Sequence, residues 1–458
     1  MTAVADAGTA GSRAGGRSEP TVDVAVVGLG PAGIAAAARA AERGARVIAL
    51  DVAPNAGGQI WRHRARATLA GEARWWLDRL ARTNAALHHG VSVVDVIHGA
   101  DHGISIVAEP HAGGAPVTVR ARSLVIATGA RERFLPFPGW TLPGVVGIGG
   151  AQALLKQGAS FAGKRVVVAG TGPLLLPVAA SLGHAGARVV LVAEQARAAD
   201  VRDFAISLVR HPGMLLQAAA YRLAFLRAPY ATGTWVAEAA GGDRVRQVTV
   251  TDGRATRVIP CDVLCTGYGL VPNLELARLA GCATADGAVV VNDAQETTVR
   301  GVFAAGEATG VGGVALALAE GEIAGAAAAG AAHPDRSLVR RRAALRDMAA
   351  ALDRTFAPRA ELRTLARADT IVCRCEDVRR GALAGLRDGR QAKLYTRAGM
   401  GACQGRVCGA ALEFLFGWPP GSVRVPLEPA RLATLTAAAS ITSDVATAPA
   451  PSTPSARS

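Results

Sequence analysis

Four cysteines in the last quarter of the sequence form two close pairs. One residue separates Cys373 from Cys375, and four residues separate Cys403 from Cys408. Thiolates bind soft metals, and the glycines beside the second pair leave backbone N–H groups free to donate to sulfur. Four cysteines suffice for one [2Fe–2S] cluster, whereas structural zinc and free thiols are the alternatives. The first pair is tighter than the C-x₂₋₄-C pairs that zinc sites usually contain.

A glycine-rich turn near the N-terminus has the spacing of a dinucleotide-binding loop. Gly28, Gly30 and Gly33 form G-x-G-x-x-G, with Pro31 and Ala32 before the third glycine. The first glycine permits the tight turn, the second lets the backbone approach a pyrophosphate, and the third lets helix and strand pack closely. A helix that begins here points free N–H groups at the phosphates. The alternative is a glycine turn that binds nothing.

An acidic residue completes this pattern. Asp51 follows Gly33 by 18 residues and ends the next apolar run, so its carboxylate can accept hydrogen bonds from ribose hydroxyls. The turn needs a strand before it and a helix after it. A strand-like composition is found at residues 22–27 and again at 47–50, and a helix-like composition lies between them at 34–43. This alternation continues along the chain and predicts an α/β fold of doubly wound parallel sheets.

A related glycine turn occurs 142 residues further along the chain. It contains Gly170 and Gly172, but Leu175 stands at the position of the third glycine. We expect this leucine to push the helix away from the strand. Glu194 ends the following strand and can still accept from a ribose. Two interpretations stay open: the domain binds NAD(P)H weakly or in an altered way, or it is a scaffold that no longer binds nicotinamide.

Three further motifs decide which dinucleotide the first turn binds. They are short, small-residue segments next to predicted strands: Gly58 with Gln59, Thr128 with Gly129, and Gly306 with Glu307. In combination with the two glycine turns, their order resembles the glutathione-reductase-like flavoproteins, which contain two dinucleotide-binding domains. The resemblance covers residues 20–330 and implies an α/β pair of Rossmann-type domains.

The resemblance assigns a cofactor to each domain. It implies that the first turn binds FAD, and that the second domain is inserted into the first and corresponds to an NAD(P)-binding domain. The Gly306 segment returns to the FAD domain, where its acidic residue contacts the ribityl or pyrophosphate part. Family members usually have aspartate there, and Glu307 keeps the carboxylate. The alternative for Glu307 is a cap of the following helix. Gln59 either lies near the flavin or makes an ordinary loop contact.

The cysteine pattern resembles the [2Fe–2S] domain of bacterioferritin-associated ferredoxin, in the version that is fused to certain flavoproteins. With this domain included, we expect six segments along the chain. They are a disordered tail at 1–20, a discontinuous FAD-binding domain at 21–158 and 272–335, an inserted NAD(P)-binding-like domain at 159–271, a helical connector at 336–368, a [2Fe–2S] domain at 369–428, and a mostly disordered tail at 429–458.

Together these domains resemble one subfamily, which contains the A-type subunits of opine oxidases, the B-type subunits of hydrogen cyanide synthases and the α subunit of D-hydroxyproline dehydrogenase. The resemblance implies an FAD- and [2Fe–2S]-containing electron-transfer subunit of a hetero-oligomeric amine or amino-acid dehydrogenase or oxidase. Its partner would be an amino-acid-oxidase-like flavoprotein subunit, with a small ferredoxin-like subunit as a further candidate. The alternatives are a free-standing NAD(P)H-dependent reductase and a non-catalytic binding module with structural zinc.

The amino-acid composition argues against several other kinds of function. The 458 residues have a net charge of +14, but only three of the fifty basic residues are lysine and aromatic residues make up 4%, so nucleic-acid binding is not expected. We expect no membrane span, because no clean apolar run reaches about 20 residues, and a cytoplasmic protein. Residues 20–260 contain no close cysteine pair, so disulfide reduction is not expected. No residue stands out as an acid or base in catalysis.

Overall fold

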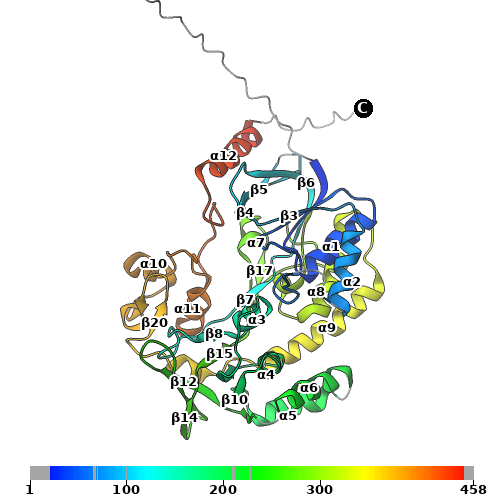
Figure 1. Cartoon of the computed structure of the whole chain (residues 1–458). Coiled ribbons are helices and arrows are strands. Elements are labelled where there is room, and N and C mark those ends of the chain that lie inside the picture. The colour runs from blue at the N-terminus through cyan, green and yellow to red at the C-terminus, as the bar shows by residue number, and fades with distance from the viewer. Residues whose placement is uncertain are drawn as a thin grey trace, which may run out of the picture.

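The computed structural model describes residues 21–64, 69, 71–99, 101–208, 212–225 and 228–447. The first expected tail, residues 1–20, lies outside the described residues. The described residues form two main sheets, the second of which is built from a segment inserted into the chain of the first, and a small cysteine-containing module that follows both (Figure 1). None of the described helices combines the length and apolar character that crossing a bilayer requires.

The first sheet has seven strands in the order β3-β2-β1-β6-β5-β4, with β19 also paired to β6. β1, β2, β3, β6 and β19 run parallel, and β4, β5 and β6 are antiparallel. The bounds are β1 Thr21–Val27, β2 Val47–Asp51, β3 Ala86–His89, β4 Val91–His98, β5 Ile104–Pro110, β6 Val117–Ile126 and β19 Val302–Ala304. β2 and residues 24–27 of β1 are buried and almost continuously apolar, as in a sheet that is covered on both faces, whereas the edge strand β3 is largely exposed.

Helices α1 (Pro31–Glu42), α2 (Gly71–Ala81) and α8 (Gly313–Ala328) share one core with this sheet. α1 and α8 cross closely because small residues line their contact. A Cβ at Gly321 would lie 2.2 Å from the carbonyl oxygen of Ala32, and a Cβ at Gly325 would lie 2.2 Å from that of Ala36. This contact places the start of α1 beside the segment that precedes α8.

The second sheet has the order β11-β10-β9-β15-β8, and all four of its pairings are parallel. Its strands are β8 Val145–Gly147, β9 Arg165–Gly170, β10 Arg188–Glu194, β11 Tyr230–Thr232 and β15 Val263–Gly267. The associated helices are α3 Ile148–Lys156, α4 Leu175–His184, α5 Ala198–Ser207 and α6 Pro212–Ala224. A separate antiparallel sheet contains β12 Trp235–Ala240, β13 Gln247–Thr251 and β14 Thr256–Pro260.

The expected start of the inserted domain at residue 159 lies too late in the chain. β8 pairs with β15, and α3 follows β8 directly, so both elements belong with the second sheet. The two domains are joined by an antiparallel ribbon of β7 (Ala130–Glu132) and β16 (Leu270–Pro272). A three-residue strand such as β8 has too little periodicity to be recognised from the sequence.

The long helix α9 (Arg336–Thr355) runs from the domain of the first sheet to the domain of the second sheet (Figure 1). Asp335 caps its N-terminus by accepting from the Ser337 N–H at 2.8 Å. Arg342 of α9 is buried and donates to Asp293 Oδ1 at 2.6 Å and to Gln295 Oε1 at 3.0 Å. These contacts fix α9 on the loops beside the first sheet.

The cysteine module lies to the left of both sheets in Figure 1. It contains β20 Ile371–Cys373, β21 Val378–Arg379, η5 Arg380–Leu383, α10 Gly389–Thr396 and α11 Cys408–Phe416. Its small core brings Cys373 and Cys408 together with apolar residues that include Val372, Leu383 and Trp418. The module therefore has a core of its own.

The expectation of a mostly disordered tail at 429–458 is wrong for α12 (Leu432–Thr447), a helix that packs on the antiparallel strands of the first sheet. Ala438 is buried against Val94 and Val107. Thr434 and Arg431 both donate to Glu109 of β5. The Ala- and Thr-rich composition resembles a linker, and the helix depends on these tertiary contacts, which the composition does not indicate. Residues 448–458 lie outside the described part.

Candidate functional site

The first glycine turn connects β1 to α1, and its shape requires glycine. Gly28 has a φ of +100°, and a Cβ there would lie 2.2 Å from the carbonyl oxygen of Ala127. A Cβ at Gly33 would lie 1.7 Å from the carbonyl oxygen of Gly28. α1 begins at Pro31 with Gly30 at its N-cap, and among the described residues no side chain caps it. The first N–H groups of α1 are therefore available to an anion.

Asp51 lies directly beneath this turn. Its buried carboxylate accepts the N–H of Leu29, the residue between the first two glycines, and the N–H of Ala53 at 2.6 Å. Burial raises the pKa of Asp51, and the two N–H donors oppose that rise. Asp51 thus supports the turn itself, and each carboxylate oxygen keeps a further lone pair for a ligand.

The neighbouring Gly57–Gly58 segment also contacts the turn. The Gly57 N–H donates to the carbonyl of Leu29 at 2.7 Å. A Cβ at Gly58 would lie 2.9 Å from the Cα of Gly30. Gln59, in contrast, is exposed and accepts a hydrogen bond from Arg62 at 2.8 Å. The structure therefore brings Gly58 to the turn and leaves Gln59 as a surface loop residue.

Thr128 and Gly129 mark the place where the chain leaves the first sheet. The Thr128 hydroxyl donates to the carbonyl of Asn273, and the Asn273 amide donates to the carbonyl of Thr128, both at 2.8 Å. Asn273 N–H also donates to the carbonyl of Gly129 at 2.9 Å. Arg131 donates to Asn273 Oδ1 at 2.7 Å and to the carbonyl of Arg406, in the second cysteine loop, at 3.1 Å. This crossing thus connects the first domain to the cysteine module.

Gly306 and Glu307 return to the start of α1. Gly306 has a φ of +73°, and a Cβ there would lie 2.7 Å from the Cβ of Ala32. Glu307 Oε1 accepts the N–H of Gly313 at 3.0 Å, so this oxygen caps α8 as the alternative interpretation predicted. Its other oxygen, Oε2, is buried and has no hydrogen-bond partner among the described residues. Burial raises the pKa of Glu307, and a ligand that donates a hydrogen bond would satisfy this oxygen.

Sequence reasoning missed the pair that holds the Gly306 turn in place. Glu320 of α8 is fully buried and accepts the Gly306 N–H at 2.9 Å and the Thr309 hydroxyl at 2.7 Å. Arg346 of α9 forms an ion pair with it at 2.6 Å. The only signal in the sequence was the presence of two acidic residues, Glu320 and Glu322, in an otherwise apolar helix.

The second glycine turn also keeps the backbone shape of its class. Gly170 has a φ of +145°, and a Cβ there would lie 1.8 Å from the carbonyl oxygen of Gly267. Glu194 is fully buried and accepts the N–H groups of Gly172 and Ala196, each at 2.8 Å. Burial raises the pKa of Glu194 to about 7. Both carboxylate oxygens are therefore engaged by the protein backbone.

Leu175 does not separate the helix from the sheet. Its side chain is fully buried in one core with Val166 and Val168 of β9 and Val178 of α4. α4 begins at Leu175, whereas α1 begins directly after the second glycine of its own turn. The later start gives the leucine room between helix and strand, so the expected displacement is replaced by a shift of the helix start.

The four clustered cysteines face one another as two pairs. The Cys373 thiol is hydrogen-bonded to Cys408, and the Cys375 thiol to Cys403. The backbone N–H groups of Gly399, Glu376 and Cys375 donate to Cys373. A Cβ at Gly401 would lie 2.3 Å from the Cβ of Cys375, so only glycine permits this approach. Within the described ranges, no three Cys, His, Asp or Glu side chains converge as ligands of a single metal ion.

The other three cysteines, Cys261, Cys265 and Cys282, are buried and free. Burial raises the pKa of Cys261 to about 11 and that of Cys265 to about 12. Cys282 lies 3.3 Å from the Thr297 hydroxyl, to which its thiol donates. A thiol with a raised pKa is a poor nucleophile, so these residues are core side chains.

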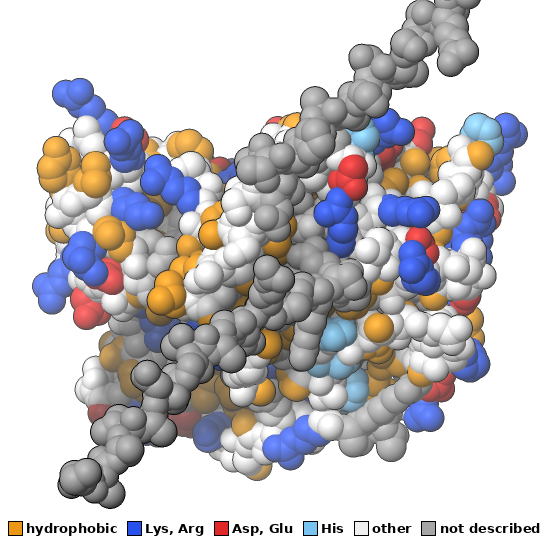
Figure 2. All heavy atoms as spheres, turned by 90° about the horizontal axis from the view of Figure 1, so that it is seen from above, with side chains coloured by type: hydrophobic (Ala, Val, Ile, Leu, Met, Phe, Trp, Pro, Cys, Tyr) orange, Lys and Arg blue, Asp and Glu red, His pale blue; other side chains and the backbone are white. Residues whose placement is uncertain are grey.

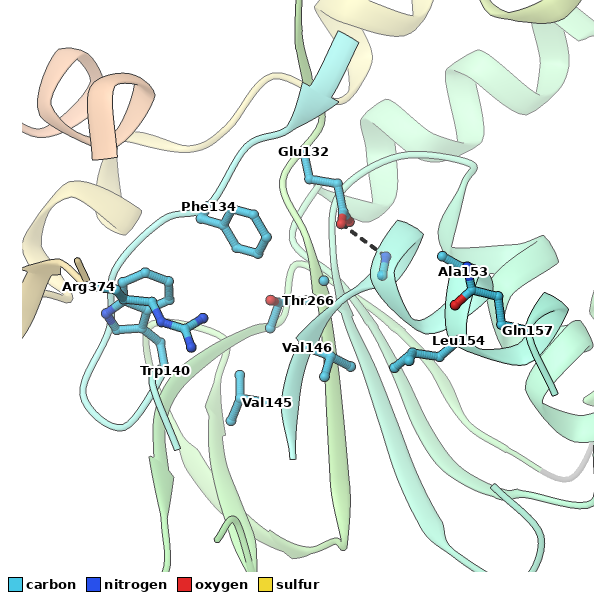
Figure 3. A pocket seen from close by; sticks show the side chains of 12 residues that line it. Glu132, Phe134, Trp140, Val145, Val146, Ala153, Leu154, Gln157, Thr266 and Arg374 are labelled. Atoms are coloured by element: carbon cyan, nitrogen blue, oxygen red, sulfur yellow. Dashed lines mark hydrogen bonds between the residues drawn. The ribbon is translucent and has the colours of Figure 1, made fainter. Parts of the chain in front are cut away.

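A cavity of about 450 Å³ lies where the second domain meets the cysteine module (Figure 3). Glu132 lines it and accepts the N–H groups of Gly149 and Gly150, at 2.7 and 3.1 Å, at the start of α3. Trp140 and Arg374 form the opposite wall, and the Arg374 guanidinium lies 5.7 Å from the Trp140 ring centroid. Arg374 stands between Cys373 and Cys375, so this cavity adjoins the cysteine pairs.

Most of the predicted residues of the first domain lie together around the start of α1. The residues joined by the contacts above are Gly28, Gly30, Pro31, Ala32, Gly33, Asp51, Gly58, Gly306 and Glu307. Thr128 adjoins Gly28 through Ala127, because a Cβ at Gly28 would lie 3.3 Å from the Thr128 nitrogen. The arrangement combines a free helix N-terminus, the buried carboxylate of Asp51, the half-buried carboxylate of Glu307 and a glycine-lined cradle. These are the features that accommodate a dinucleotide.

Comparisons with known proteins agree with this geometry. Residues 22–331 match the family described as pyridine nucleotide-disulphide oxidoreductase. The A-type subunit of the opine oxidase of Agrobacterium tumefaciens (strain Ach5) is 32% identical over 90% of this chain and 91% of its own. The HcnB subunit of the hydrogen cyanide synthase of Pseudomonas aeruginosa is 32% identical over 84% of this chain and 90% of its own.

One solved structure resembles most of the chain. The L-proline dehydrogenase of P. horikoshii superimposes with a TM-score of 0.66 and 19% identity, over 91% of this chain and 80% of that chain. At this identity the likeness concerns the fold, which is the expected α/β pair of dinucleotide-binding domains. The protein is an FAD-dependent oxidoreductase and belongs to the pyridine nucleotide-disulphide oxidoreductase family.

Proposed function

We propose that this chain is the FAD- and [2Fe–2S]-containing electron-transfer subunit of a hetero-oligomeric amine or amino-acid dehydrogenase or oxidase. Its similar relatives are named as subunits of an opine oxidase and of a hydrogen cyanide synthase. The observation that carries the proposal is the presence of two facing thiol pairs in a module that is hydrogen-bonded to the flavin domain.

The residues at the start of α1 fit FAD. The uncapped N–H groups of α1 would bind the pyrophosphate, and Asp51 would accept from a ribose hydroxyl. The unpartnered Oε2 of Glu307 would accept from the ribityl part of the cofactor. Bound FAD supplies the ability to take up two electrons together and to release them singly. The chain's own residues bind and orient the cofactor, and none of them has a proposed role in proton transfer.

The two thiol pairs fit a binuclear cluster better than a single zinc ion. A [2Fe–2S] cluster is ligated by four thiolates, two on each iron, and is stabilised by backbone N–H donors to sulfur. Cys373 with Cys408, and Cys375 with Cys403, would supply these ligands. The three N–H donors around Cys373 match the second requirement. One tetrahedral zinc would need all four sulfurs around one point.

Arg131 would keep the two redox centres in a fixed relation. It forms an ion pair with Glu275 at 2.9 Å beside the Thr128–Asn273 crossing, and it donates to the carbonyl of Arg406 between Cys403 and Cys408. Arg406 in turn forms an ion pair with Glu428 at 2.8 Å. One rigid network therefore extends from the flavin domain into the second cysteine loop.

The outer face of the cysteine module has the features of a surface that binds a protein partner. Leu394, Tyr395 and Met400 are exposed, and Tyr395 is 75% accessible. In Figure 2 the lobe at the left, which contains α10, has Lys and Arg side chains around hydrophobic ones. Exposed apolar groups with a polar rim are typical of interaction sites. The proposed partners are the amino-acid-oxidase-like flavoprotein subunit and a small ferredoxin-like subunit, all in the cytoplasm.

Metal and sulfide analysis of the purified protein tests the cofactor content. We expect iron and acid-labile sulfide in equal amounts, and an electron paramagnetic resonance signal after reduction with dithionite. Cys375→Ser should remove this signal, whereas Cys282→Ser, a change at a buried cysteine outside the module, should keep it. Zinc without sulfide would contradict the electron-transfer function.

Co-purification tests the assembly. Leu394→Asp with Tyr395→Asp should abolish co-elution with the flavoprotein partner while flavin and iron contents stay unchanged. Leu432→Asp is the matched control, because Leu432 is similarly exposed but lies on α12. Equal co-elution of both variants would refute docking at α10.

A further inference from the structure

A short segment of the chain lies across the second glycine turn. Residues 356–359, which we call the strap, follow the C-terminus of α9. The Thr171 hydroxyl donates to the carbonyl of Phe356 at 2.8 Å. The Gln195 amide donates to the carbonyl of Ala357 at 3.1 Å, and its oxygen accepts the N–H of Arg359 at 3.0 Å. Three hydrogen bonds therefore tie the strap to the turn and to the end of β10.

These contacts fall on the two positions where a dinucleotide would be recognised. Thr171 lies between Gly170 and Gly172, and Gln195 follows Glu194 at the end of β10. In dinucleotide-binding domains the pyrophosphate crosses the glycine turn, and the ribose reaches the acidic residue at the end of the second strand. A ligand at these positions would have to replace the strap.

Side-chain packing holds the strap on both sides. The Phe356 ring packs edge-on against Phe204 of α5, with ring centroids 5.6 Å apart. A Cβ at Gly172 would lie 3.9 Å from Phe356, so the phenylalanine fills the space above the second glycine. The Arg359 guanidinium lies over the Trp235 ring at 4.8 Å.

The acidic residue of this domain has no exposed surface, whereas Asp51 of the first domain is 7% exposed. Glu194 is fully buried, and each of its oxygens accepts a backbone N–H. In the first domain, the nearest atom to a Cβ placed at Gly30 would be the Cα of Gly58, at 4.0 Å, so no segment like the strap lies over this glycine among the described residues. The second domain thus has the family's fold, whereas its own chain fills the position of the nucleotide.

We infer that the strap occupies the nicotinamide dinucleotide position of the second domain and excludes NADH and NADPH from it. The residues there do not fit a nicotinamide dinucleotide, although the family's description implies one. Electrons therefore do not enter the protein from a nicotinamide dinucleotide bound to the second domain. The inference rests on the contacts of the strap alone and is independent of the metal content of the cysteine module.

Equilibrium dialysis of the holoprotein against NADH and NADPH tests the exclusion. Nucleotide concentrations up to about 1 mM cover the ordinary range of Michaelis constants. The wild type and a control, Gln247→Ala on β13, should show no saturable binding. Gln195→Ala with Phe356→Ala, which removes two strap bonds and the ring, should bind nucleotide with a dissociation constant at least tenfold below the upper limit of about 1 mM. Leu175→Gly alone should not bind.

Three results would overturn the inference. The first is stoichiometric binding by the wild type, and the second is binding by Leu175→Gly with the strap intact. The third is an absence of binding by the strap variant while its flavin spectrum is native. Hydrogen exchange gives a second measurement: Gln195→Ala should speed exchange of the Arg359 N–H, which Gln195 accepts. Unchanged exchange there would show that the strap is not held as described.

Discussion

Removing Arg346 should weaken the FAD-binding domain strongly. Arg346 Nη2 lies 2.6 Å from Glu320 Oε1, and Glu320 is fully buried while it holds the Gly306 turn. Loss of one partner from a buried ion pair costs about 3–5 kcal/mol. The Arg346 side chain is 38% exposed, so water screens the pair in part, and we expect Arg346→Ala to cost about 3 kcal/mol.

Urea unfolding of the holoprotein, followed by flavin fluorescence, measures this loss. At a urea dependence of about 3 kcal/mol per molar, the midpoint of FAD release should fall by about 1 M. Arg340→Ala is the matched control, because Arg340 is exposed on the same helix. Its effect should stay within about 0.5 kcal/mol.

The effect of Arg346→Ala should also depend on pH. Burial raises the pKa of Glu320, and Arg346 lowers it, so the variant has a still higher pKa in the folded state. A carboxyl whose folded-state pKa is raised stabilises the fold at low pH, and this stability is lost as pH rises through the raised pKa. The deficit should therefore be larger at pH 8 than at pH 5. Equal midpoints for Arg346→Ala and Arg340→Ala at both pH values would show that Arg346 does not stabilise the buried Glu320 carboxylate.

Three further changes have definite expected outcomes. Gly33→Ala should abolish FAD retention, because its Cβ would lie 1.7 Å from the Gly28 carbonyl oxygen; a normal flavin-to-protein absorbance ratio after gel filtration would contradict this. Burial raises the pKa of Glu194 from 4.5 to about 7, so the wild type should lose stability as pH rises across this range. Glu194→Gln should remove this slope in urea midpoints, and a persisting slope would exclude Glu194 as its source. Ala438→Asp should release α12, because Ala438 is buried against Val94; hydrogen exchange in β4 should then increase, and unchanged exchange would argue against the contact.

The parts of the site that depend on local sterics could be predicted from the sequence. Gly28 and Gly33 are required because a Cβ at either position would overlap a carbonyl group, and their spacing reveals this without any tertiary information. The order of strands and helices follows from apolar runs in the same way. The α/β fold and the FAD-dependent oxidoreductase class were confirmed for this reason.

The parts that depend on distant contacts could not be predicted. Arg346 meets Glu320, and residues 356–359 meet Thr171 and Gln195, across separations that no local pattern encodes. α12 forms because it is hydrogen-bonded to Glu109 and packs on strands β4 and β5. Leu175 is a further example. Glycine is expected at this position when the helix begins directly after the turn, but α4 begins later, at Leu175 itself, and the leucine is accommodated.

The proposed electron-transfer function is tested most directly by an anaerobic experiment on this chain together with the proposed flavoprotein partner. The amine substrate is added, and electron paramagnetic resonance follows the cluster while absorbance follows the flavin. We expect the amine to reduce both centres only when the partner is present, and we expect neither NADH nor NADPH to reduce them. Reduction of the flavin by either nucleotide in this chain alone would contradict this expectation.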